Sequence, residues 1–515
     1  MDDRKHRQVL PAILACILLI GGPGAAAAED HAADFACGGR VESETWALWD
    51  DKVRAGFERE MLRERLLEQG DTYALYDLQL YSHSLWSMAG QCNRAERLRE
   101  AAALVRAAYT ALQPVPGAGR GWICKGGTIC AENALVDTEV KLVSFQFLGL
   151  ASFIANALAR SPAPRTPEDS AFIDETVRIV VEHMVRWASD YEMHRLQMVS
   201  NARLSEIRKD DSFLLFSDQD LWQLTIYAEL AGLLQSQARR HNAGIDVDPR
   251  IRPHLNALLK AFAARVSMQR TSAGRMPNVD MADLDRGYWA RMSANRFAGY
   301  EGAGKPVECS PVPRLRMPAR LVALRTDTGW DFSHARRLVQ ALDAFERNRA
   351  AMKSVFGISE SRMPRPNLST AFAATLVNRI WNGDMVRPLF ANYWSGANGW
   401  FGARYDTDAA ACSEGMTPYA MTDTFPTGGF ITWSRRIPLI GALGRRLYDL
   451  TRASAPDEAK FIDDFYPTLG RKIPEEYRAL HMTMFLASLV GAAQPAGPVP
   501  GPVGTTGGLA SVEGK

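Results

Sequence analysis

The chain mixes two kinds of apolar pattern, and both have the period of a helix. Residues 217–235 and 367–381 are apolar or small at almost every position, which is typical of helices surrounded by other helices. Residues 249–267 are apolar on one face only, as in a helix at the surface. Alternating strand patterns are scarce. Further helices are expected at 43–69, at 71–113 with an interruption near Gly90, and at 133–160.

A helix start is marked clearly at Thr166. This capping residue is followed by Pro167, which suits the first turn, and by two acidic residues, which favour the positive end of a helix. The residues that follow carry one apolar stripe, so we expect a half-exposed outer helix.

Buried helices together with amphipathic ones predict an all-α fold. No internal repeat with a period of about 20–50 residues is present, which argues against a regular solenoid. The pattern favours an α/α toroid, a complete or incomplete barrel of helical hairpins with long aromatic- and glycine-rich loops. We expect a signal peptide at 1–28, the toroid domain at 29–491 and a disordered low-complexity tail at 492–515.

The first residues have the order of a secretory signal. A basic segment precedes the apolar run VLPAILACILLIGG and the small-residue segment PGAAAAED, which predicts cleavage near Ala28. The apolar run is short for a spanning helix, so no stable transmembrane segment is expected after cleavage, and retention as an anchor is the alternative. A periplasmic or secreted location follows.

Six cysteines remain if Cys16 leaves with the signal, and an even number in an exported chain implies disulfides. Cys124 and Cys130 flank a Gly-Gly turn, which favours a local bridge between them. Sequence order then suggests two further pairs. These are Cys37 with Cys92 and Cys309 with Cys412.

Charge and motifs exclude several classes of protein. With 60 basic and 58 acidic residues, the chain has no net field that would attract nucleic acid. Nucleotide-binding glycine motifs and the nucleophile elbow are absent, and the cysteines lack the close spacing of zinc ligands. We therefore expect neither cofactor nor metal.

The stretch from Trp381 to Trp433 is the richest in candidate binding residues. It holds eleven aromatic residues in 53 positions, interrupted by glycines and prolines, whereas aromatics make up 9% of the whole chain. A tryptophan ring stacks well on the apolar face of a sugar ring, and the competing interpretation is a set of hydrophobic plugs. The candidate binding residues are Trp394, Asn398, Trp400, Arg404, Tyr405 and Trp433.

This layout resembles, in a general way, the secreted α/α-toroid proteins that act on polysaccharides. The resemblance covers about residues 43–490 and is based on helix pattern, compartment and aromatic loops, without a motif of one named family. It implies that sugar lies in a groove over one end of the inner ring.

Two acidic groups are candidates for catalysis. Glycoside hydrolysis needs one protonated and one ionised carboxylate across the scissile bond. Asp211 and Asp218 lie before and at the start of a buried helix, where Asp220 is expected to form a helix cap with Ser217. The second acidic group, Asp406 and Asp423, lies among the aromatic residues of the stretch from Trp381 to Trp433. Desolvation there would raise the pKa of a carboxylate towards that of a general acid.

An elimination would use other residues. A polysaccharide lyase needs a Tyr or His that moves the proton beside a uronate carboxylate, and an Asn or Arg that neutralises this carboxylate. Tyr and His on an inner helix are more often core residues with a single hydrogen bond. Tyr81, His83, Asn398 and Arg404 are the candidates. Tyr76 and Asp77 lie near the first two in the chain.

The sequence therefore predicts an exported glycoside hydrolase or polysaccharide lyase with a polysaccharide or oligosaccharide as its partner. The alternative is a noncatalytic protein of the cell envelope that binds glycans or assists exopolysaccharide assembly, with an envelope protein as a possible partner. The two classes share the aromatic surface and differ in whether catalytic groups converge on it.

Overall fold

The computed structural model describes residues 33–115, 119–241, 247–306, 325–403 and 413–492. It is 63% helix and 6% strand, which confirms the all-α class. The predicted signal peptide, Arg404, Tyr405, Asp406, Cys309, Cys412 and residues 493–515 of the predicted tail lie outside the described residues.

The N-terminal part is one long helical segment followed by two helices. The first segment alternates between α- and π-helical turns from Arg40 to Glu68, where the sequence predicts a plain helix at 43–69. The predicted interruption near Gly90 falls between α4 and α5. The elements are α2 (Arg40–Leu48), η1 (Trp49–Val53), α3 (Arg54–Gly56), η2 (Phe57–Glu68), α4 (Tyr73–Gln91) and α5 (Ala95–Tyr109).

A short hairpin separates these helices from the next group. Strands β1 and β2 pair antiparallel, with Pro114 opposite Arg120. The capping box predicted at Thr166 is present, because the Thr166 hydroxyl accepts from the Asp169 amide at 3.1 Å and Asp169 accepts from the Thr166 amide at 2.9 Å. The elements are β1 (Gln113–Val115), β2 (Gly119–Gly121), α6 (Thr128–Glu132), α7 (Lys141–Arg160), α8 (Pro167–Trp187), α9 (Asp190–Asn201), η3 (Leu204–Glu206), η4 (Ser212–Leu214), α10 (Asp218–His241) and α11 (Ile251–Arg265).

The C-terminal part begins with a second hairpin and ends in a long buried helix. Strands β3 and β4 pair antiparallel, with Met268 opposite Ala282. The elements are β3 (Val266–Arg270), β4 (Asp280–Leu284), η5 (Tyr288–Arg291), η6 (Ser293–Asn295), α12 (Phe332–Ala335), α13 (Arg337–Phe356), η9 (Glu360–Arg362), α14 (Leu368–Thr375), η10 (Leu376–Ile380), α15 (Thr424–Thr427), η12 (Phe430–Arg435), α16 (Pro438–Arg452), α17 (Pro456–Phe465) and α18 (Glu475–Ala492).

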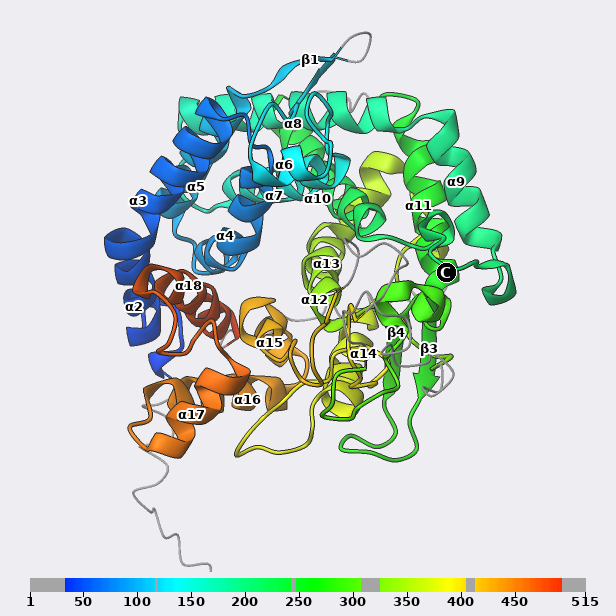
Figure 1. The fold of residues 1–515 in the computed structure, drawn as a ribbon. Helices are drawn as coiled ribbons and strands as arrows, with labels where there is room; N and C mark the ends of the chain where they lie inside the picture. Colours follow the sequence, from blue (N-terminus) through cyan, green and yellow to red (C-terminus); the bar gives the residue numbers. More distant parts are fainter. Residues whose placement is uncertain (1–32, 116–118, 242–246, 307–324, 404–412, 493–515) are drawn as a thin grey trace, which may run out of the picture.

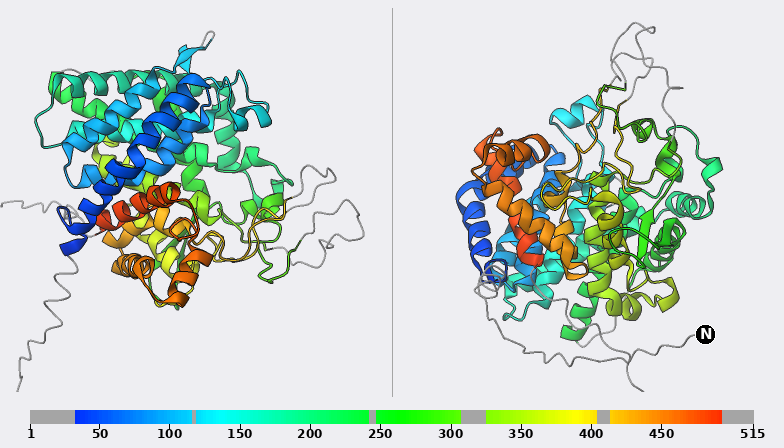
Figure 2. Two further views of the ribbon diagram at one scale, coloured as in Figure 1. Left: turned by 60° about the vertical axis from the view of Figure 1, so that its left-hand side comes forward. Right: turned by 90° about the horizontal axis from the view of Figure 1, so that it is seen from below.

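Four helices from distant parts of the chain pack side by side in series. Helix α4 contacts α7, α7 contacts α10 and α10 contacts α13, while α18 returns to α4. Figure 1 shows α5, α8 and α9 on the outside of these helices. Figure 2 shows the N-terminal helices beside α18, which contacts both α2 and η1.

Two cysteine pairs predicted from the sequence are confirmed as disulfides. Cys37 is joined to Cys92 with a Cα–Cα distance of 5.4 Å, and Cys124 is joined to Cys130 with a Cα–Cα distance of 6.4 Å. The first bridge fastens the N-terminal segment to the end of α4. Such pairs are compatible with an oxidising compartment.

Among the described residues, one helix has the length and apolar composition of a membrane span. It is α7, and 83% of its most apolar window is buried inside the protein. Its neighbours α4, α8 and α10 cover it. A core helix fulfils the same criteria of length and composition as a membrane span.

Candidate functional site

The inner helices α4, α7, α10 and α13 begin at the same end of the molecule. The Gln146 amide of α7 donates to the Tyr76 carbonyl of α4 at 3.2 Å. Asp218, at the start of α10, forms an ion pair of 3.2 Å with Arg337, at the start of α13. We call this end the mouth and define it by Tyr76, Asp77, Tyr81, Arg336 and His481.

Two neighbouring arginines meet one tyrosine at the mouth. Arg336 and Arg337 each donate to the Tyr76 hydroxyl at 3.2 Å. Arg337 is neutralised by Asp218, but Arg336 has no carboxylate partner within the described ranges. Burial, and then repulsion from Arg337, lower the pKa of Arg336. An anion bound beside Arg336 would relieve both effects.

Asp77 is the carboxylate on the α4 side of the mouth. Arg65 of η2 donates to Asp77 at 2.6 Å and to Asp71 at 2.8 Å, so it bridges the two acids. Burial raises the pKa of Asp77 although the Arg65 guanidinium acts in the opposite direction. Asp77 is therefore held in place by a guanidinium, as Asp218 is on the other side.

Tyr81 and His481 face one another between α4 and α18. Their rings are 5.6 Å apart, centroid to centroid, with an edge-to-face angle of 80°. Burial raises the pKa of Tyr81, and the charge of Asp77 adds to this, while the charge of Arg336 lowers it. Tyr81 is therefore within the electrostatic influence of both Asp77 and Arg336.

His481 is held in the neutral form with a defined tautomer. Its Nδ1 lies 2.8 Å from the Tyr477 carbonyl, which only accepts, so Nδ1 carries the proton. Burial lowers the pKa of His481, although the bond to the carbonyl raises it. Nε2 is left with a lone pair that can accept a proton.

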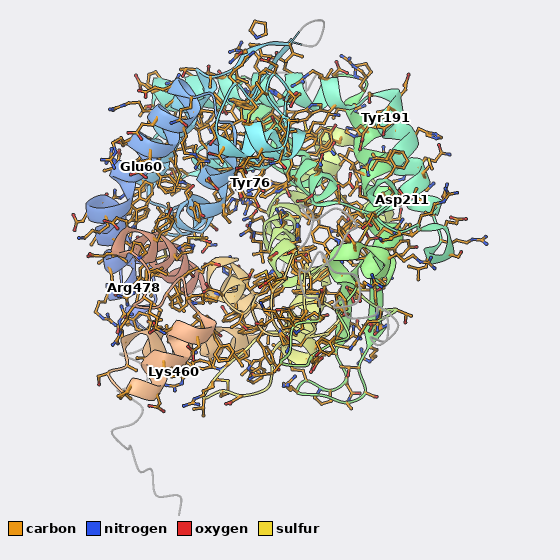
Figure 3. All side chains as sticks on the ribbon, in the orientation of Figure 1. Glu60, Tyr76, Tyr191, Asp211, Lys460 and Arg478 are labelled. Atoms are coloured by element: carbon orange, nitrogen blue, oxygen red, sulfur yellow. A yellow bond between two sulfur atoms is a disulfide. The ribbon has the colours of Figure 1, made fainter. Side chains whose placement is uncertain are left out.

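These groups have complementary chemistry. His481 offers a base, the Tyr81 hydroxyl offers an acid, and Arg336 offers an unneutralised positive charge. Figure 3 shows Tyr76 near the middle of the molecule, on the inner side of α4. The arrangement suits an anionic ligand from which a proton is removed.

The aromatic residues predicted to stack on sugar lie in the core instead. Trp394 is fully buried and its indole N–H donates to the Ala282 carbonyl at 3.2 Å. The indole N–H of Trp400 donates to the Gly302 carbonyl at 2.9 Å, and Trp433 packs edge-on against Trp394. A sugar ring would have to displace core side chains to reach them.

Asn398 supports the surrounding loop. It is 6% exposed, its side-chain oxygen accepts from the Tyr419 backbone N–H at 2.8 Å, and its backbone N–H donates to the Glu301 carboxylate at 3.3 Å. Each bond joins a backbone N–H to a side-chain oxygen, so Asn398 ties its own segment to those of Tyr419 and Glu301.

The predicted acids do not form one group. Asp218 lies at the mouth beside Arg337, whereas Figure 3 places Asp211 well away from Tyr76. Asp423 accepts from the Thr468 amide at 3.1 Å, and burial raises the pKa of Asp423 to about 6. Asp220 is buried and caps its helix with Ser217, as expected, since it accepts from the Ser217 amide at 2.7 Å.

His83 lies deeper along α4 than the mouth. It is 9% exposed, its ring lies against Phe153, and burial lowers the pKa of His83 to about 3. Its Nδ1 has no hydrogen-bond partner among the described residues. His83 is therefore a neutral core residue at the pH of most compartments.

Sequence reasoning missed two basic residues of the mouth, Arg336 and His481, and Arg337 beside them. Arg336 and Arg337 stand together at the start of an amphipathic helix, where such pairs are usually solvated. His481 was the better signal, because it is the single imidazole of α18 and stands where this helix turns from charged to largely apolar residues. Its meaning depends on contact with α4, from which it is 400 positions distant (Tyr81 against His481).

Another buried acid lies on β4. Asp283 is 2% exposed, neither of its oxygens has a hydrogen-bond partner in the described part of the chain, and burial raises the pKa of Asp283 to about 7. Arg379 is its nearest cation, at 3.9 Å. This acid shares no contact with the mouth and lacks an adjoining base.

Comparison of the chain with protein-family models, with curated proteins and with solved structures gave no match. The chemistry of the mouth therefore has to be interpreted from its own geometry.

Proposed function

We propose that the protein is a polysaccharide lyase that cleaves acidic, uronate-containing polysaccharides by elimination. The observation that carries this proposal is Arg336, a guanidinium without a carboxylate partner in the described chain. It donates to the Tyr76 hydroxyl of α4, the helix on which the Tyr81 ring meets the ring of the neutral His481. A uronate carboxylate would supply the missing negative charge.

Each group then has one task in the reaction. Arg336 binds the carboxylate and stabilises the negative charge that develops on it when the neighbouring carbon loses its proton. His481 Nε2 takes this proton, and the electron pair of the broken C–H bond forms the new C=C bond. The bond to the leaving sugar oxygen breaks, and Tyr81 donates its proton to that oxygen. Transfer through water from His481 to Tyr81 restores both groups.

Elimination is favoured over hydrolysis by the state of the carboxylates. Hydrolysis requires two acids that are free to act across the bond. Asp77 and Asp218 are each bound by a guanidinium, Arg65 and Arg337 respectively, so neither carboxylate is free to move to a substrate. The proton-transfer groups with open positions are the tyrosine and the histidine.

The proposal extends to the overall architecture of the protein and to its cellular compartment. We infer that α4, α7, α10, α13 and α18 form the inner ring of an α/α toroid with the mouth at one end. The contacts of α18 with α4 and of η12 with α13, α14 and α18 support closure of this ring. The two disulfides support a periplasmic or secreted location.

Mass spectrometry of products tests the proposal. The purified protein is incubated with uronate-containing polysaccharides and with the same polymers after reduction of their carboxylates to alcohols. Unsaturated fragments are expected from the acidic polymers alone. Fragments that carry one added water would contradict elimination and indicate a hydrolase.

Variants of the mouth assign the roles. His481→Ala and Tyr81→Phe each remove a proton-transfer group and should lower kcat by about 100-fold or more. Arg336→Gln should lower kcat/KM for acidic polymers by about 100-fold. Matched changes at exposed positions, Tyr191→Phe and Arg63→Gln, and the distant Asp211→Asn should leave activity unchanged.

A noncatalytic glycan-binding protein is the second candidate, and the paired state of Asp77 and Asp218 favours it as well. In that case acidic polymers would be retained without a change of mass. Retention that is lost in Arg336→Gln but kept in His481→Ala would support binding alone.

A further inference from the structure

A cavity lies apart from the mouth and shares none of its residues. It has a volume of about 610 Å³ and lies between α11, β3 and the segment from η9 to α14. Its floor is apolar and includes Phe262, Met363 and Leu368, which are 2%, 6% and 3% exposed. Figure 1 shows α11, β3 and α14 on the side of the molecule opposite α2 and α3. This size is typical of small-molecule sites.

The rim of this cavity is positively charged. Lys260, Arg362 and Arg365 line it, all three side chains are exposed, and no lining residue is acidic. Arg362 donates to the Asn256 side chain at 3.0 Å, and no ion pair joins the three cations to a carboxylate of the described residues. Glu360, the nearest acid in the sequence, is already bound by Arg349 and Lys353.

We propose that this cavity binds a single-chain acidic amphiphile, an apolar chain with a carboxylate or phosphate head. The apolar floor would remove the chain from water, and the head would lie among the three cations and reduce their mutual repulsion. A neutral apolar chain would make only the apolar contacts with the floor, and a small anion would make only the electrostatic contacts with the rim.

A small amphiphile matches the site better than an acidic peptide does. The cavity is bounded on three sides, and its volume lies in the range for small ligands. The Pro364 carbonyl beside it, an acceptor that a peptide backbone would need, already accepts from Arg349 at 2.6 Å. The proposal does not depend on the lyase reaction.

Calorimetric titration of the full chain tests it with four kinds of ligand. They are palmitate below its micelle concentration, hexadecyl phosphate, uncharged hexadecanol, and acetate or inorganic phosphate as heads alone. Palmitate and hexadecyl phosphate should compete for a single site per chain. The affinity of hexadecanol should be lower than that of palmitate by about tenfold or more. The heads alone should not bind measurably.

Two variants locate the binding. Lys260→Gln combined with Arg362→Gln should lower the affinity for palmitate by about tenfold or more and leave the affinity for hexadecanol unchanged. Ala263→Trp, at an exposed position that lines the cavity, should block both ligands by filling it. Arg252→Gln changes a nearby exposed cation outside the cavity and serves as the control.

Several outcomes would overturn the proposal. These are palmitate binding that is equal in all variants, binding of many palmitate molecules per chain, and binding of phosphate alone with similar affinity. Binding of an acidic amphipathic peptide in place of palmitate would assign the cavity to a protein partner. If Ala263→Trp does not fold, as judged by circular dichroism, the charge variants decide.

Discussion

Asp423 is a buried carboxylate whose surroundings disfavour its ionised form. One oxygen accepts from the Thr468 amide at 3.1 Å, whereas the other is buried and has no partner among the described residues. Burial raises the pKa of Asp423 from 3.8 to about 6. A shift of this size corresponds to about 3 kcal/mol of lost stability when the group is ionised.

Asp423→Asn should therefore stabilise the protein in a pH-dependent way. Below the ordinary pKa both the folded and the unfolded states are protonated, so the parent loses nothing. Between that pH and about 6 the unfolded state ionises first and the parent is penalised, and above pH 6 the penalty is complete. Thermal unfolding should show equal Tm values near pH 3.5 and a higher Tm for the variant at pH 8. A difference that shrinks as pH rises would contradict this.

Single residues show why the sequence located an aromatic cluster but not its role. The indole N–H groups of Trp394 and Trp400 are satisfied by backbone carbonyls. Stacking on a ligand and packing in a core require the same flat apolar face, so composition cannot separate them. Only the partner of each N–H distinguishes the two, and that partner is more than 90 positions away in both cases.

The two disulfides differ in the length of chain that they close. Cys37 and Cys92 are 55 positions apart, and Cys124 and Cys130 are 6 apart. Loop-closure entropy assigns about 4 kcal/mol to the longer loop and about 2 kcal/mol to the shorter one. The longer bridge also fastens the N-terminal segment to the end of α4.

Replacement of each pair by alanine should follow this order. Cys37→Ala with Cys92→Ala should lower the free energy of unfolding by about 2 kcal/mol more than Cys124→Ala with Cys130→Ala. Urea unfolding of both variants, beside the parent, measures the difference. An equal loss in both variants would mean that burial at the fully buried Cys124 and Cys130 outweighs chain entropy.

At the scale of elements, the helix caps could be predicted from the sequence, and the π-helical turns could not. The caps at Thr166 and Ser217 follow from two or three neighbouring residues, and both are present. The π-helical turns in η1 and η2 have no such local mark, and each segment begins at a buried aromatic residue, Trp49 or Phe57. The sequence therefore predicts one helix there and misses the widened turns.

The mouth could not be assembled from the sequence because its parts come from three distant helices. Tyr81 belongs to α4, Arg336 precedes α13 and His481 belongs to α18. Sequence reasoning named the residues of α4, which are Tyr81 with Tyr76 and Asp77 nearby in the chain, but neither Arg336 nor His481. The other partners depend on which helix starts meet, which is a property of the whole packing.

The contact of α18 with α4 makes the last helix part of the central core. Phe485 of α18 is fully buried, whereas Phe461 of the outer helix α17 is 6% exposed and α17 packs mainly on α16. Removal of either ring by substitution with alanine should cost about 3–5 kcal/mol. We expect Phe485→Ala to lower amide-exchange protection in α4 and α7 as well as in α18, because the loss is transmitted through the inner helices. Phe461→Ala should lower protection in α16 and α17 alone. Hydrogen exchange resolved by peptide measures both, and loss of protection confined to α18 in Phe485→Ala would show that this helix opens independently of the core.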